Sequence, residues 1–242
     1  MKNKIVIGYS TNLSKDFQKE FKKELLDSVG LSQEKSEVAI IAYDNDGFLS
    51  LSEAYNDIWE CAETFKDAIY VFIHHDIHFK SNGWGRTLLD LFNNNEVDII
   101  GVAGTEKLYQ HGSWPFDENF QADIKSKNLW GKMWQLNEQD EPYLSDFTGA
   151  AKKCKTLQPV VVVDGIFIAF NPETCLKFDE DFDDFHFYDI SFCVKNHTQG
   201  KRVAVTETIE IFHESMGYTD EVWNQNRLKF CEKYLPYLPL SV

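Results

Sequence analysis

The sequence predicts an α/β protein in which helices flank a mainly parallel sheet. Two observations support this fold class: short apolar runs alternate with amphipathic helical patterns, and several of these runs end in acidic residues or glycine. Strands that alternate with helices are typical of parallel sheets joined by right-handed crossovers. Because the 242 residues contain no repeat and no low-complexity linker, we expect a single domain over residues 1–242.

The first part of the chain predicts strands and helices in regular alternation. Strands are expected at residues 4–8, 37–43, 68–73 and 98–102, and helices at residues 15–28, 50–64 and 83–93. The second of these helices has the clearest start, because Ser50 is placed to cap it and Glu53, three residues later, completes a capping box. The strand at residues 68–73 is rich in Ile, Tyr, Val and Phe, which suit a buried pleated strand.

The second part of the chain has a weaker pattern. Residues 104–158 are expected to form long irregular connections, in which Trp114, Trp130 and Trp134 stand among polar residues. Long loops in a compact domain are often functional, although the aromatic side chains could equally pack a small subdomain. Regular structure is expected again with strands at residues 160–163, 203–205 and 210–212, and helices at residues 187–197 and 221–234.

Composition and charge exclude several classes of protein. A hydrophobic fraction of 43% and an aromatic fraction of 14% are typical of a folded globule. The net charge of −15 argues against a nucleic-acid partner and against electrostatic attachment to anionic lipid. The five cysteines include no Cys-x-x-Cys pair, so we expect reduced structural thiols. With neither a signal peptide nor a membrane span in the sequence, a cytoplasmic protein is expected, and peripheral association with the inner face of the membrane stays open.

An apolar strand that ends in ionisable residues is the most informative feature of the sequence. His74, His75, Asp76 and His78 follow the apolar run directly. Ligands of open α/β sheets bind at the carboxyl ends of the strands, where a carboxylate between imidazoles could hold a divalent cation and its diphosphate. If the strand pattern continued, His74, Asp76 and His78 would share one face. The alternative is that these histidines are only hydrogen-bonded at the end of a strand.

Three further places carry polar residues that could serve chemistry. Asp189 lies at the start of a predicted helix, where a carboxylate usually stabilises the helix dipole but could also act as a general base with a pKa tuned by burial. His213 ends a strand-like run and could add another imidazole. Asp164 and Gly165 follow four consecutive valines, and the glycine would let a substrate approach the backbone.

The order of these segments resembles that of bacterial family-2-type glycosyltransferases. The resembling segments are residues 52–56, 71–77, 83–85, 100–104, 163–170, 178–180, 188–189, 200–203 and 213. The resemblance runs from about Ile5 to His213 and implies the GT-A fold. In that fold a Rossmann-like nucleotide-sugar-binding half, here residues 1–103, is continuous with an acceptor-binding and catalytic half, here residues 104–242. The acceptor side would carry a smaller antiparallel portion.

The resemblance implies an inverting glycosyltransferase. It would move a sugar from a nucleotide diphosphate donor, with a UDP-sugar favoured, to a glycan or lipid-linked acceptor in the synthesis of a cell-surface polysaccharide. Asp189 would match the aspartate that deprotonates the acceptor hydroxyl. Contacts with the nucleotide sugar are expected from Ser10, Asp44, Asn56, His75, Asp76, Asp164 and Gly165.

The same resemblance implies a cation and an acceptor site. Asp76, together with His74 and His213, would hold Mn²⁺ or Mg²⁺ against the diphosphate. Trp114 and Tyr188 would contact the acceptor. The chain departs from the family pattern where His74 replaces the first aspartate of the Asp-x-Asp motif, and where Tyr188 precedes the base in place of glutamate.

Two other functions stay open at the level of sequence. A sugar nucleotidyltransferase would be expected to carry a Gly-rich basic loop after the first strand, and residues 8–12 contain neither an arginine nor a second glycine. A non-catalytic nucleotide-sugar-binding protein would bind the same donor without turnover. The sequence does not name the donor sugar, the acceptor or the oligomeric state, and residues 230–240 could pack on their own domain, on a second subunit or on a membrane surface.

Overall fold

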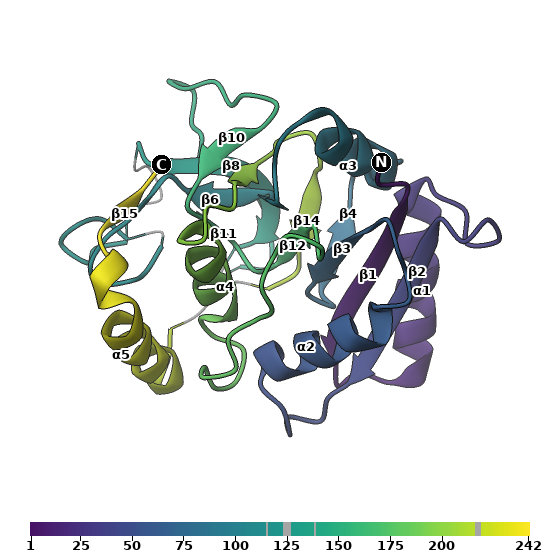
Figure 1. Ribbon diagram of the computed structural model, residues 1–242, viewed down its shortest axis with the longest axis horizontal. Coiled ribbons are helices and arrows are strands. Elements are labelled where there is room, and N and C mark those ends of the chain that lie inside the picture. Colours follow the sequence, from purple (N-terminus) through teal and green to yellow (C-terminus); the bar gives the residue numbers. More distant parts are fainter. Residues whose placement is uncertain (115, 123–126, 138, 216–218) are drawn as a thin grey trace.

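A computed structural model describes residues 1–114, 116–122, 127–137, 139–215 and 219–242, and its centre is a seven-stranded sheet (Figure 1). Across this sheet the order is β10-β13-β5-β12-β3-β1-β2. Its strands are β1 (Lys4–Thr11), β2 (Val38–Asp44), β3 (Ala68–Ile73), β5 (Ile99–Gly101), β10 (Gln158–Val160), β12 (Phe167–Phe170) and β13 (Val203–Val205). The α/β prediction is confirmed, and the predicted strands at residues 68–73 and 203–205 have the bounds that the structure shows.

Five helices and a 3-10 turn accompany the sheets in the described part of the chain. They are α1 (Lys15–Val29), α2 (Leu51–Ala62), α3 (Trp84–Asn94), α4 (Tyr188–His197), α5 (Glu221–Tyr234) and η1 (Leu235–Tyr237). The capping box predicted for α2 is present, since Ser50 accepts from the Glu53 N–H and Glu53 accepts from the Ser50 N–H. Among these helices, none combines the length and apolar character that crossing a bilayer requires.

The two faces of the large sheet bury different helices because the strand side chains alternate. On β3, Tyr70 and Phe72 pack with Trp59 of α2 and Phe192 of α4 in one hydrophobic cluster. Ile69, Val71 and Ile73 pack in a second cluster with side chains of α1 and α3. This continuous apolar strand is therefore buried on both sides, which is typical of the centre of an α/β sheet.

The sheet departs from the mainly parallel pattern that the sequence predicted. β1 runs parallel to β2 and β3, and β13 runs parallel to β5, but β12 runs antiparallel to both of its neighbours, β3 and β5. β10 is antiparallel to β13. The reason lies in the approach of β12: Phe167 pairs with Ile73, so β12 enters the sheet at the carboxyl end of β3 and must run back along it.

A second sheet adjoins the first and has the order β11-β6-β8-β14-β4, with β9 paired to β8. Its strands are β4 (Ile77–Phe79), β6 (Ala103–Thr105), β8 (Leu129–Leu136), β9 (Pro142–Asp146), β11 (Val162–Val163) and β14 (Ile211–His213). Most of its pairs are antiparallel, as expected for the smaller portion. A short pair of β7 (Lys107–Leu108) and β15 (Leu240–Ser241) ties down the C-terminal segment.

Two predictions for the middle of the chain were wrong. Residues 104–158 were expected to be irregular, but Trp130 and Trp134 lie on β8, an eight-residue strand. The single strand expected at residues 160–163 is divided, since β10 belongs to the large sheet and β11 to the small one. The chain passes from the large sheet to the small one at Val161, whose N–H donates to the carbonyl of Thr105 on β6.

Candidate active site

A cavity of about 760 Å³ opens where β1 and β3 end and where α4 begins. Ser10 comes from the end of β1, and residues 74–76 form the turn after β3. The turn between β11 and β12 adds Asp164 and Gly165, while Asp189 lies in the first turn of α4. All of the site residues predicted from the sequence line this cavity, except Asp44 and Asn56.

His74, Asp76 and His213 form the cluster in this cavity that could hold a metal ion. Each offers one ligand atom, and these atoms lie within 4.8 Å of one another. Asp76 Oδ1 is 3.4 Å from His213 Nε2 and 3.9 Å from His74 Nδ1. The pairing of β14 with β4 places His213 opposite Ile77, which directly follows Asp76. Two imidazoles and a carboxylate are a donor set that suits a divalent transition metal such as Mn²⁺.

The protonation states of Asp76 and His74 suit cation binding. Burial would raise the pKa of Asp76, but the hydrogen bond and charge of His213, with smaller effects from His74 and Ser215, hold that pKa below its usual value. Burial, and next the charge of His213, lower the pKa of His74 to about 4. At neutral pH the carboxylate is therefore charged and the His74 imidazole neutral, which are the forms that bind metal.

Tyr188 connects this cluster to the start of α4. Its hydroxyl lies 2.7 Å from His74 Nε2, and its side chain is buried. A Cβ atom on Gly165 would lie only 2.0 Å from that hydroxyl oxygen, so a larger residue would not fit at this position of the turn unless Tyr188 moved. The backbone N–H of Gly165 donates to Asp189 Oδ2 at 3.0 Å. The tyrosine, the glycine and the aspartate thus form one packed unit.

Asp189 has the titration behaviour that a general base needs. Burial, and next the negative charge of Asp164, raise the pKa of Asp189 to about 7, against a lowering by hydrogen bonds from backbone N–H groups that include Gly165. Burial also raises the pKa of Asp164, opposed by the Ile166 N–H and the charge of His213. A carboxyl that titrates near neutrality can accept a proton under physiological conditions.

Aromatic side chains form the other wall of the cavity. Trp114 packs edge-on against Phe147 with ring centroids 5.9 Å apart. Trp223, from the first turn of α5, contacts Phe187 at 5.5 Å and Phe116 at 6.0 Å between centroids. Trp114, Phe116 and Trp223 are partly exposed and line the cavity. Such a surface suits the apolar face of a sugar ring.

Several predicted residues have other surroundings. Asp44 is exposed and bonds Lys15 and Gln18. Asn56 is buried, and its amide bonds the backbone of Phe178 in both directions. Their contacts with a donor stay predictions.

His75 lies in the cavity, with its Nδ1 3.1 Å from the Ser10 carbonyl oxygen. The expectation that His74, Asp76 and His78 share one face was wrong, because β3 ends at Ile73 and the chain turns before β4. His78 bonds Glu24 and Glu214 instead.

Sequence reasoning missed Ser215, Phe116 and Trp223. Ser215 donates to Asp76 Oδ2 at 2.7 Å and lies 3.1 Å from His213 Nε2, so it braces two members of the cluster. Its position two residues after His213 was the available signal, since alternate residues of an extended chain share a face. Trp223 had no such signal, because only the folding of α5 against the cavity brings it there.

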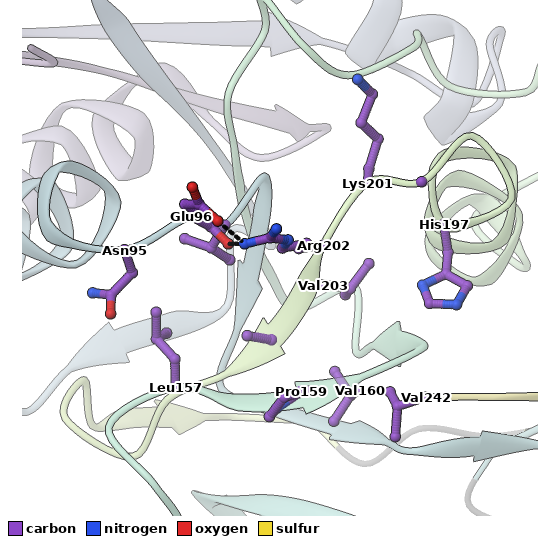
Figure 2. A pocket seen from close by; sticks show the side chains of 13 residues that line it. Asn95, Glu96, Leu157, Pro159, Val160, His197, Lys201, Arg202, Val203 and Val242 are labelled. Carbon is purple, nitrogen blue, oxygen red and sulfur yellow. Dashed lines mark hydrogen bonds and ion pairs between the residues drawn. The ribbon is translucent and has the colours of Figure 1, made fainter.

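A second cavity of about 570 Å³ lies beside the N-terminal ends of β5 and β13 (Figure 2). Leu157, Pro159 and Val203 give it an apolar lining, and at its edge the Arg202 guanidinium pairs with Glu96. It shares no lining residue with the first cavity. The cluster of metal-ligating groups and the carboxyl with a pKa near 7 both lie in the first cavity, which is therefore the candidate active site.

Comparisons with known proteins identify a family and a similar fold. A family model described as "Glycosyltransferase like family" matches residues 18–234. The crystal structure of GalNAc-T7 with UDP, GalNAc and Mn²⁺ aligns with a TM-score of 0.55 at 10% identity, over 92% of this chain and 45% of that chain, and this likeness shows the fold alone. The crystal structure of A197 from STIV aligns over 90% of this chain and 87% of that chain at 11% identity, with a TM-score of 0.45 that is too low to support a conclusion. No curated protein matches the sequence.

Proposed function

Because the chain belongs to the glycosyltransferase-like family whose model matches residues 18–234, we propose that it transfers a sugar, with inversion, from a UDP-linked donor to a saccharide acceptor. That it is a glycosyltransferase, and that its α/β fold is of the GT-A type, are both confirmed by the family match and the structural likeness. The donor, the acceptor, the stereochemistry and the use of metal are the proposed part. The observation that carries them is the convergence of His74, Asp76, His213 and Asp189 on one cavity.

The donor is proposed to bind beside the metal-ligating cluster. His74, Asp76 and His213 would hold the ion, and two imidazoles favour Mn²⁺ over Mg²⁺, which prefers oxygen ligands. When bound, the cation neutralises the charge that develops on the diphosphate leaving group. Ser10 and His75, at the ends of β1 and β3, would contact the nucleotide. The UDP and Mn²⁺ bound to GalNAc-T7, a protein of similar fold, support this arrangement.

Asp189 is proposed to activate the acceptor. Its carboxylate would take the proton from the acceptor hydroxyl while the hydroxyl oxygen attacks the anomeric carbon and the bond from that carbon to the diphosphate breaks. Attack from the face opposite the diphosphate gives inversion. The raised pKa of Asp189 makes it a stronger base than an ordinary carboxylate and still leaves much of it ionised near pH 7. Asp164 keeps that pKa high through its charge.

The acceptor is proposed to lie against the aromatic wall. Trp114, Phe116 and Trp223 offer flat apolar surfaces to a saccharide such as a growing cell-surface glycan or its lipid-linked precursor. The donor would then contact mainly residues 1–103 and the acceptor mainly residues 104–242. The proposed cation site spans this division, because His213 comes from the second half and His74 and Asp76 from the first.

The test is turnover of nucleotide sugars. The protein is incubated with each common nucleotide sugar, Mn²⁺ and simple alkyl glycosides as acceptors, and released nucleoside diphosphate is measured by liquid chromatography and mass spectrometry. We expect release from one donor, faster with an acceptor, in the wild type and in Asp90→Ala, a control at an exposed position on α3. Asp189→Asn and Asp76→Ala should lose it. Binding without release would instead indicate a non-catalytic nucleotide-sugar-binding protein. Formation of nucleoside triphosphate and sugar 1-phosphate only after pyrophosphate is added would indicate a nucleotidyltransferase.

A further inference from the structure

The two ring nitrogens of His74 have separate partners. Nδ1 faces the metal-ligating cluster, 3.9 Å from Asp76 Oδ1. Nε2 points away from Asp76 and lies 2.7 Å from the hydroxyl oxygen of Tyr188, a side chain that is only 4% exposed. The tyrosine contributes nothing to the cluster directly, yet it holds the ring of one of its members.

The direction of this hydrogen bond depends on the tautomer of the imidazole. A neutral imidazole can bind a cation through Nδ1 only when its proton is on Nε2. In that tautomer the Nε2–H of His74 donates to the hydroxyl oxygen of Tyr188. Partners of this kind orient a metal-binding histidine and raise its basicity. Without the hydroxyl, the ring would lose this partner and would be free to rotate.

The same tyrosine is joined through the backbone to the proposed base. Asp189 follows Tyr188 directly, and Asp189 Oδ2 accepts from the Gly165 N–H at 3.0 Å. Ile166, the next residue after the glycine, accepts at its carbonyl from the His74 N–H at 3.2 Å. The contacts therefore close a ring that runs from His74 through Tyr188, Asp189 and the turn at residues 165–166, and back to His74.

This closed set of contacts among His74, Tyr188, Asp189 and residues 165–166 is tightly packed as well as hydrogen-bonded. A Cβ atom on Gly165 would lie 2.0 Å from the Tyr188 hydroxyl oxygen and 3.0 Å from Asp189 Cβ. The tyrosine ring also packs edge-on against Tyr55, with centroids 5.6 Å apart. Interiors packed in this way do not deform continuously, so the hydroxyl has little freedom to move away from His74.

We infer that Tyr188 is a positioning residue that fixes His74 for cation binding and ties the cation site to the segment that carries Asp189. The inference rests on the proposed function, because it takes His74, Asp76 and His213 to be cation ligands. It assigns Tyr188 a role that differs from the acceptor contact implied by the resemblance. In this role the tyrosine acts through His74 and through the chain.

The test measures the affinity for Mn²⁺ alone, with no nucleotide and no turnover. Free Mn²⁺ is followed by electron paramagnetic resonance during titration of wild type, Tyr188→Phe, Asp76→Ala and Tyr234→Phe. Tyr234 is the matched control, because it is also a buried tyrosine whose hydroxyl makes one bond, to Asp179 at 2.8 Å, and it lies outside the cavity lining. Thermal melts in the absence of metal verify that each variant is folded.

Loss of a group that hydrogen-bonds a metal-binding histidine typically costs about 10–100-fold in metal affinity. We therefore expect Tyr188→Phe to weaken Mn²⁺ binding by about that factor, Asp76→Ala to weaken it further, and Tyr234→Phe to leave it unchanged. Equal affinity of Tyr188→Phe and wild type would overturn the inference while leaving the cation site in place. Equal weakening by both tyrosine variants would also overturn it. If wild type binds no Mn²⁺, the proposed cation site itself fails.

Discussion

Asp76 and Asp189 share one cavity, but their surroundings shift their pKa values in opposite directions. Asp76 accepts a hydrogen bond from Ser215 and lies beside His213 and His74, which keep its pKa low. Burial, and next the negative charge of Asp164, raise the pKa of Asp189 to about 7. Two carboxyls whose pKa values are pushed apart in this way can take different roles, one as a permanent anion and the other as a proton acceptor.

The pH dependence of transfer follows from the Asp189 carboxyl. As the proposed general base, Asp189 acts only when ionised, and its pKa is about 7. The rate at saturating substrate is therefore expected to be level above about pH 8 and to fall about tenfold per unit below about pH 6. Measurement of kcat from pH 5 to 9 tests this expectation. A flat profile through pH 6 would show that another group, or none, takes the proton.

The same carboxyl is expected to reduce stability. The folded protein holds the Asp189 proton more tightly than the unfolded chain, in which an aspartate has a pKa of about 3.9. Ionisation therefore lowers the free energy of unfolding as the pH rises from about 4 through 7. Asp189→Asn removes this loss, so the variant should unfold at higher denaturant concentration than wild type at pH 8 and should differ less at pH 5. Chemical denaturation of both proteins at both pH values measures this difference. An Asp189→Asn variant that is less stable than wild type at pH 8 would contradict the expectation.

Among the structural elements, the long connection from β12 to α4 illustrates how the site is supported. Three buried asparagines from different helices bond its backbone in both directions. Asn196 of α4 bonds Leu176, Asn56 of α2 bonds Phe178, and Asn226 of α5 bonds Asp183. Each amide supplies both a donor and an acceptor, which satisfies backbone groups that strand pairing would otherwise satisfy. This connection leads directly into Tyr188 and Asp189.

The strength of this support can be measured at Asn56. Its side chain is 5% exposed, and its amide also donates to Glu180 at 2.7 Å. Asn56→Ala would leave the backbone groups of Phe178 without partners, so the free energy of unfolding should fall by about 1–3 kcal/mol. Asn94→Ala, at an exposed position on α3, is the control and should change it by about 0.5 kcal/mol or less.

Urea denaturation of both asparagine variants provides the comparison, together with their affinities for nucleoside diphosphate. A weaker affinity for nucleotide with unchanged stability would favour the donor contact that the sequence predicted for Asn56.

The helices were largely predictable, several strands were not, and the exceptions have physical causes. β3 and the capped helix α2 carry strong local signals, namely a continuous apolar run and a capping box. β8 was missed although Leu129, Gly131 and Met133 are buried in alternation, because Trp130 and Trp134 on the other face conceal the period of two. β12 was not predicted as a strand, and its antiparallel course depends on where the chain leaves the second sheet.

At the scale of the whole molecule, the site is assembled from segments far apart in the sequence. Figure 1 shows the β1–β2 edge with α1 at one end of the molecule and α5 with β15 at the other, with most of the labelled strands between them. The metal-ligating cluster joins residues 74–76 to His213, and Tyr188 reaches back to His74. The sequence indicated which residue types end the strands, but only the pairing of β14 with β4 and the docking of α4 bring them within bonding distance. Trp223 arrives in the same way, through α5.

A thermal-shift panel of nucleoside diphosphates, each with and without Mn²⁺, tests the central claim most directly on wild type and Asp76→Ala. A ligand at about 100 times its Kd stabilises the folded protein by about 2.7 kcal/mol, which gives a measurable rise in Tm. We predict a rise with one nucleoside diphosphate, UDP by preference, that requires Mn²⁺ and is absent in Asp76→Ala. No rise with any nucleotide, or an equal rise in Asp76→Ala, would contradict a cation-assisted donor site in this cavity.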